Sequence, residues 1–161
     1  MNASRLRGDV ELVTSNGSVD VRELDGPIVI RTSNGHVQVD EIRGALQATT
    51  SNGGIDARLR RPEPHRPVRL SSSNGHIQLT MDSVEDNEVR ASTSNSSITV
   101  KLPSSVRARV QARTSHGSIR SDFDVDHDFH DNKSRIEGTI GGGGPTLELS
   151  TSNGSIHLLK L

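Results

Sequence analysis

The stretch Thr14-Ser15-Asn16-Gly17-Ser18-Val19 recurs, with small changes, six more times along the 161-residue chain. The further copies are TSNGHV at 32–37, TSNGGI at 50–55, SSNGHI at 72–77, TSNSSI at 93–98, TSHGSI at 114–119 and TSNGSI at 151–156. Measured at the Asn position, the successive steps are 18, 18, 22, 21, 21 and 37 residues. A period near 20 residues is typical of a solenoid, in which each repeat forms one coil and stacks on its neighbours.

Apolar and polar residues alternate on both sides of every copy. In the first copy, Val10 and Leu12 precede the motif, and Val19 and Val21 follow it. The matching pairs are Ile28/Ile30 with Val37/Val39, Leu46/Ala48 with Ile55/Ala57, Val68/Leu70 with Ile77/Leu79, Val89/Ala91 with Ile98/Val100, Val110/Ala112 with Ile119/Ser121, and Leu147/Leu149 with Ile156/Leu158. A period of two predicts half-buried strands, so each repeat is expected to be a strand, a tight Ser-Asn-Gly corner, a second strand and a wider bend.

Two all-β architectures compete for this pattern. In an antiparallel meander, Asn-Gly would form a hairpin turn, but nothing would then require the same Thr, Ser and Asn in every turn. A solenoid stacks like residues on like at about 4.8 Å, which explains the repetition. The sequence therefore predicts an all-β, single-domain β-solenoid over residues 1–161, with about seven coils, an N-terminal flank at 1–7 and an irregular acidic, His-rich segment at 122–134.

Parity along the strand assigns a direction to each residue of the corner. Thr14 and Asn16 continue the inward series of Val10 and Leu12, so both are expected to point into the coil. Stacked Asn side chains would form an internal hydrogen-bonded ladder, and Gly17 would supply a positive φ. Ser96 replaces the Gly in the fifth copy and is expected to be strained there. The predicted ladder column is Asn16, Asn34, Asn52, Asn74, Asn95, His116 and Asn153.

The composition excludes several classes of function. Hydrophobic residues make up 30% of the chain, which is too few for a thick globular core but sufficient for the thin core of a solenoid. With 19 basic and 20 acidic residues and no Trp or Tyr, the chain has neither the charge nor the stacking platforms of a nucleic-acid-binding protein. There is no Cys, which rules out disulfides and thiolate chemistry. No apolar run approaches the length of a membrane span or of a signal sequence.

The closing segment is the most specific part of the sequence. It runs Ile136-Glu137-Gly138-Thr139-Ile140-Gly141-Gly142-Gly143-Gly144-Pro145 and continues through Leu147 to Ile156. With the earlier copies, it resembles the bacterial putative-adhesin β-solenoid family, a domain of largely unknown function. The resemblance implies a right-handed, parallel β-helix-like domain of the cell envelope, usually exported and often part of a longer anchored protein, with no established catalytic residues.

Two groups of residues raise the question of metal binding. The segment at 122–134 could offer His and carboxylate ligands for Zn²⁺ or Ca²⁺, although it matches neither HExxH nor the EF-hand loop. Its candidate ligands are Asp124, Asp126, His127, Asp128, His130 and Asp131, and a solvated loop is the alternative. His36 and His76 share one column, but Gly54 stands between them, so they are expected to be separate surface residues.

A complete column of Ser residues is predicted to face outward beside the corner. Such an array could meet a polysaccharide, but Ser beside a corner also bonds its own backbone. The column comprises Ser15, Ser33, Ser51, Ser73, Ser94, Ser115 and Ser152.

The function predicted from these observations is a non-catalytic, adhesin-like structural or interaction module of the bacterial cell envelope or exterior, without a cofactor. Its partners would be itself, through end-to-end or edge association, or a cell-surface protein or polysaccharide. Two alternatives stay open, a polysaccharide-active enzyme on a β-helix scaffold and a metal- or ligand-binding sensor. Fold analogy is the sole support for an enzyme.

Overall fold

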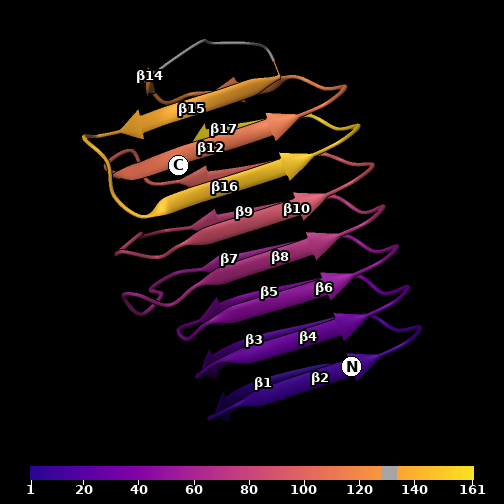
Figure 1. The fold of residues 1–161 in the computed structure, drawn as a ribbon. Helices are drawn as coiled ribbons and strands as arrows, with labels where there is room; N and C mark the ends of the chain where they lie inside the picture. The colour runs from indigo at the N-terminus through magenta and orange to yellow at the C-terminus, as the bar shows by residue number, and fades with distance from the viewer. Residues whose placement is uncertain (128–133) are drawn as a thin grey trace.

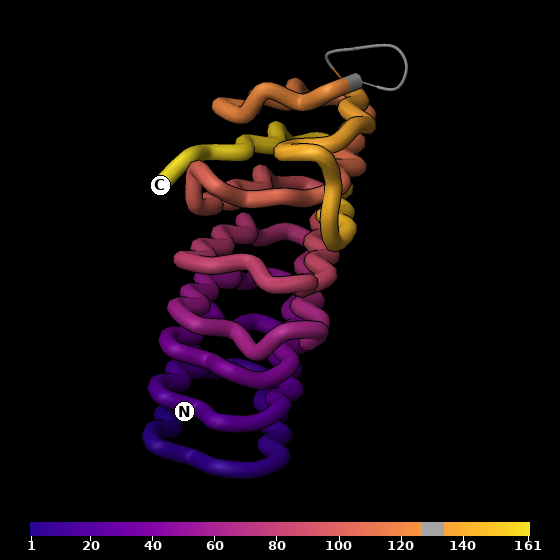
Figure 2. The backbone as a smooth tube through the Cα atoms, turned by 90° about the vertical axis from the view of Figure 1, so that its left-hand side faces the viewer, coloured from indigo at the N-terminus to yellow at the C-terminus, as the bar shows by residue number. Residues whose placement is uncertain are grey.

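The computed structural model describes residues 1–127 and 134–161, which form strands and connecting turns without a helix. Two β-sheets face each other along the length of a slender stack, and the chain passes from one sheet to the other in each coil (Figures 1 and 2). The predicted all-β solenoid is confirmed. In the described part of the chain, no helix offers the length and apolar character that a membrane crossing requires.

The strands after the corners form most of the first sheet, and the strands before them form most of the second. The first sheet has the order β1 (Asn2–Arg7), β3 (Val19–Asp25), β5 (Val37–Ile42), β7 (Ile55–Leu59), β9 (Ile77–Met81), β11 (Ile98–Leu102), β17 (Ile156–Lys160), β13 (Ile119–Ser121). The second has the order β14 (Asp126–His127), β15 (Arg135–Ile140), β12 (Ala108–Thr114), β16 (Thr146–Thr151), β10 (Val89–Thr93), β8 (Val68–Ser72), β6 (Leu46–Thr50), β4 (Ile28–Thr32), β2 (Val10–Thr14).

Neighbouring coils pair in parallel and in register, so each inward side chain packs on the equivalent side chain of the next coil. Ile28 pairs with Leu46, and Leu46 pairs with Val68 in the coil beyond it. All three side chains are at most 1% exposed. The thin core therefore runs the whole length of the stack, as the alternating pattern predicts.

The coils do not follow chain order near the C-terminus. Strand β16 lies between β10 and β12 and pairs in parallel with both, and β17 lies between β11 and β13 in the same way. Figure 1 shows the yellow β16 between these two earlier strands. The last repeat in the sequence is thus the sixth coil in space, and the sixth repeat is the last coil.

The 37-residue step between the last two corners contains the connection that makes this possible. Strand β15 runs antiparallel to β12 on its outer edge, before the chain turns back and enters the stack as β16. Phe123 is buried at this end of the core, with Lys160 Nζ 5.4 Å from the centre of its ring. These elements cover the C-terminal end of the solenoid.

The N-terminal segment differs from its prediction as a flank. Residues 2–7 form β1, which pairs in parallel with β3, so the solenoid begins one strand earlier than the repeats suggest. The segment carries no copy of the corner motif, and its alternation is therefore too short to stand out in the sequence.

Candidate functional site

The corner asparagines form a continuous ladder along the stack. Asn34 Nδ2 donates a hydrogen bond to Asn16 Oδ1 over 2.7 Å, and the same bond repeats at each step to Asn153. Because the last repeat is inserted, Asn153 donates to Asn95, while His116 lies above Asn153 and bonds to its coil through the backbone. The predicted ladder is confirmed for the six asparagines, whereas His116, also a predicted member, joins the column through its backbone alone.

The asparagines point outward, and the prediction that they face the interior is wrong. All six are exposed, whereas the Thr or Ser two residues earlier is buried in every coil but the first. The inward parity of the strand holds as far as that residue and then fails, because the chain turns and the alternation of side chains ends with the strand.

The inward hydroxyls connect successive corners. Thr50 Oγ1 accepts a hydrogen bond from Gly53 N over 3.3 Å and donates one to the carbonyl of Gly35 in the coil beneath over 3.2 Å. Ser72 repeats both bonds one coil further on. The hydroxyl thus satisfies backbone groups that the tight turn leaves without strand partners.

The corner glycines are needed for close approach, and the prediction of a positive φ is wrong. No corner glycine has a positive φ in the described residues. A Cβ on Gly53 would instead collide with the carbonyl of Gly35, which lies directly beneath it.

Ser96 occupies this column, and its φ is not positive either, so the strain predicted for it is absent. At its corner, both Ser94 N and Asn95 N donate to the carbonyl of Ser73, over 3.2 and 3.0 Å. This corner differs from the other described corners, where the serine carbonyl beneath accepts from one amide only.

The serine column faces solvent in every coil, as predicted. It lies next to the exposed asparagines, so the two columns together form a polar ridge along one side of the molecule. We call these residues the corner ridge. It presents hydroxyl and amide groups at the spacing of the coils, about 4.8 Å.

His36 and His76 come together, which contradicts their predicted separation. Their ring centres are 6.0 Å apart, and both Nε2 atoms face the carboxylate of Asp56, over 3.0 and 3.3 Å. Gly54 makes this possible, because a Cβ there would collide with the imidazole of His76. The missing side chain between the two histidines is therefore the reason that they can share one carboxylate.

Half of the six predicted metal ligands lie outside the described residues. Asp124 and Asp126 are exposed, and only the backbone of His127 is described, in the short strand β14. Asp128, His130 and Asp131 lie outside the described residues. Within the described ranges, no group of three His, Asp or Glu side chains is arranged to hold a metal ion.

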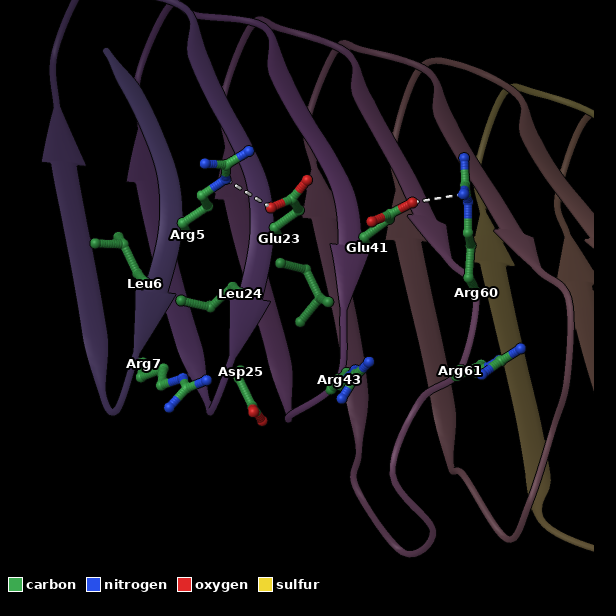
Figure 3. A pocket seen from close by; sticks show the side chains of 11 residues that line it. Arg5, Leu6, Arg7, Glu23, Leu24, Asp25, Glu41, Arg43, Arg60 and Arg61 are labelled. Carbon is green, nitrogen blue, oxygen red and sulfur yellow. Dashed lines mark hydrogen bonds and ion pairs between the residues drawn. The ribbon is translucent and has the colours of Figure 1, made fainter.

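A groove of about 630 Å³ lies on the first sheet, near the N-terminal end of the stack (Figure 3). We call it the arginine groove. It is lined by Arg5, Leu6, Arg7, Glu23, Leu24, Asp25, Glu41, Ile42, Arg43, Arg60 and Arg61. Polar side chains come from four neighbouring strands or the turns that follow them. The lining also includes the buried Leu24 and Ile42 and the half-buried Leu6.

One row of the groove is built on unusual backbone. Arg5, Glu23 and Glu41 occupy equivalent positions in β1, β3 and β5, and their φ angles are 54°, 54° and 59°. Each left-handed residue costs about 1 kcal/mol or more, and here it inserts an extra outward residue between two inward ones. Two ion pairs join neighbouring side chains along this row. Arg5 pairs with Glu23 over 3.2 Å, and Glu41 pairs with Arg60, from the turn after β7, over 2.6 Å.

A second row lies along the other side of the groove. Figure 3 shows Arg7, Asp25, Arg43 and Arg61 one after another along it. None of the four forms an ion pair with another described residue. Three guanidinium groups and one carboxylate therefore face solvent without a partner in the described part of the protein.

Beside the groove, Arg22 forms a bidentate contact with Asp20, with both N to O distances at 3.2 Å. This hydrogen bonding and the negative charge of Asp20 raise the pKa of Arg22, so its guanidinium stays charged at every physiological pH. Because the guanidinium of Arg22 is paired with Asp20, the unpaired positive charge of the groove lies in the second row.

A sequence feature marks this groove, but it lies at the wider bends and not at the corner motif. Just before three of these bends the sequence reads SRLRG at 4–8, RELDG at 22–26 and DEIRG at 40–44. Two polar residues in succession interrupt the alternation in each case, which marks the extra residue of a bulge. Aligning the repeats on their bends as well as on their corners would have revealed it.

The fold is similar to that of one solved structure, described as a putative cell adhesion protein from Clostridium sporogenes ATCC 15579. The likeness has a TM-score of 0.52 at 10% sequence identity and covers 99% of this chain and 92% of the other. At this identity it shows the fold alone. No curated protein matches the chain. Residues 66–159, more than half of the sequence, match the family described as Toastrack DUF4097, and the chain therefore belongs to this family.

Proposed function

We propose that this protein is a non-catalytic adhesion module that acts at the surface of a bacterial cell. The corner ridge carries this proposal, because it presents one repeated set of exposed hydroxyl and amide groups along the whole stack. Such a surface suits contact with another extended molecule better than enclosure of a small one. The similarly folded structure described as a putative cell adhesion protein gives further support.

Attachment of protein-coated beads to bacterial cells tests the adhesive role. Beads coated with the folded chain should attach in larger numbers than beads coated with the same chain after heat denaturation. Equal attachment of both would contradict the proposal. Incubation with a panel of polysaccharides provides the test of the non-catalytic part, because release of new reducing ends would show an enzyme.

We also propose that two copies associate through the N-terminal edge of the stack. Among the described residues, β2 pairs only with β4 and β1 pairs only with β3, which leaves one side of each strand with unpaired backbone groups. Val13 on this edge is 61% exposed. The other end of the stack is covered by β15 and Phe123, so the edges of two N-terminal coils would pair with each other.

Sedimentation at several concentrations tests this pairing. Val10 N donates to Pro27 in the next coil, so the amide of Val13, three residues on, points to the free edge. Val13→Pro should therefore abolish association without disturbing the β2–β4 ladder, while Val13→Ala should retain it because the backbone donor is kept. A wild-type chain that stays monomeric at high concentration, or equal association of the proline variant, would refute the pairing.

A further inference from the structure

We infer that the arginine groove is a binding site for an acidic polysaccharide that carries carboxylate groups. The proposal goes beyond the adhesive role, because the groove lies on the first sheet and shares no residue with the corner ridge. Its occupant would be a strand of uronate sugars that lies along the stack, across β1, β3, β5 and β7.

The charge of the groove favours an anion. It is lined by Arg5, Arg7, Arg43, Arg60 and Arg61 against Glu23, Asp25 and Glu41. In the first row, each arginine is paired with a glutamate, so the positive and negative charges of the row balance. The second row retains the unpaired guanidinium groups of Arg7, Arg43 and Arg61, and a guanidinium matches a carboxylate in geometry, with two parallel hydrogen bonds.

The backbone supplies a second, independent observation. Three stacked non-glycine residues with positive φ are costly. Such conformations persist only where the surrounding structure holds them, and they cluster at active sites and ligand-binding sites. The three residues Arg5, Glu23 and Glu41 also line the groove, so the strained backbone and the hollow coincide. Residues 55–59 of the next coil lack the bulge and keep a regular alternation of buried and exposed positions, so the bulge ends where Arg60 and Arg61 begin.

The mixture of charges distinguishes a sugar polymer from a polyphosphate or a nucleic acid. A dense row of phosphates would be repelled by Asp25 and by the two glutamates. The groove also lacks an aromatic ring on which a base could stack. A uronate chain has both carboxylates for the arginines and hydroxyl groups that can donate to Asp25. Arg43 and Arg61 come from successive coils, and Arg7 comes from two coils before Arg43, in a stack whose coils repeat at about 4.8 Å.

Calorimetry with oligogalacturonate as the probe tests the proposal. The wild-type chain should bind it, with an affinity that falls as salt is raised, and should not bind a neutral dextran of similar size. The double variant Arg43→Gln, Arg61→Gln should lose about tenfold or more in affinity, because each substitution removes a charge-assisted hydrogen-bonding group. The matched control is Arg31→Gln, Arg69→Gln, which removes two exposed arginines of the second sheet and should bind as the wild type does.

The remaining measurements test the folding of the variants and the specificity of binding. Both double variants should have the same unfolding temperature as the wild type, because the four arginines are exposed and unpaired within the described structure. Equal loss in both double variants would show a nonspecific charge effect and overturn the proposal, as would the absence of binding. Inorganic polyphosphate that binds as tightly as oligogalacturonate would overturn the assignment to a sugar. Because this assay uses purified protein, its failure would leave the bead-attachment result intact, and the reverse is also true.

Discussion

At the scale of single residues, every position of the Thr-Ser-Asn-Gly corner has a separate physical task. The Thr hydroxyl bonds backbone groups of two successive corners, and the Ser and Asn face solvent. After the first coil, each corner Gly lies directly on the corner beneath, where a Cβ would meet a carbonyl oxygen. The Gly recurs because the same close contact is made at Gly35, Gly53, Gly75, Gly117 and Gly154.

Gly53→Ala should destabilise the protein by about 1 to 3 kcal/mol, the usual cost of forcing an extra carbon into a packed contact. Gly17→Ala provides a matched control, since a Cβ at the first corner would meet only Thr14 Oγ1, at a relaxed 3.6 Å. Urea unfolding of the two variants measures the difference. Equal stability would show that the corner relaxes freely and that close approach does not select glycine.

At the scale of elements, the strands and their register could be read from the sequence. The inward positions of β4, Ile28 and Ile30, are buried as the alternation predicts, and the same holds for the later coils except at β13, where Ile119 and Ser121 are half-buried. Alternation specifies the register, because a slip of one residue would turn the buried face to solvent. The direction of the Asn side chains could not be read in this way, since they lie beyond the end of the strand.

The Asn ladder links the coils by side-chain hydrogen bonds. Its members differ in the number of these bonds that they make. Asn74 donates to Asn52 and accepts from Asn95, whereas Asn16 at the first coil only accepts, from Asn34. Asn74→Ala should therefore cost about 1 kcal/mol, and Asn16→Ala about half of that or less, because the amides are exposed and each net bond is worth little. Thermal unfolding of the two variants checks this order. A larger loss for Asn16→Ala would contradict a ladder of equivalent bonds.

At the scale of the whole molecule, the inserted last coil improves the packing of the core. In the second sheet, Leu149 lies between Ala91 and Ala112. If the coils followed chain order, the two alanines would stack on each other and leave the core underfilled. In the first sheet, Leu158 similarly separates Val100 from Ser121. The least apolar coil is thereby placed at the end of the stack, under the cap formed by β15 and Phe123.

Leu149→Ala should destabilise the protein by about 2 to 5 kcal/mol, because it would place three alanines in succession and leave a cavity between buried coils. Leu12→Ala removes the equivalent side chain in the half-buried first coil and should cost clearly less. Chemical unfolding of both variants gives the comparison. A similar cost at the two positions would argue against a central place for the last repeat.

The sequence by itself determined the solenoid, its strands, their inward faces and the ladder column. These depend on the period of the repeat and on the alternation of apolar and polar residues within each strand, and both can be read directly along the chain. The tertiary structure alone decided the order of the last coils and the meeting of His36 with His76 across Gly54. It also decided the arrangement of the arginine groove. Each of these depends on which segments lie side by side, and that is settled by how large and small side chains fill the shared core and by where a missing side chain leaves room.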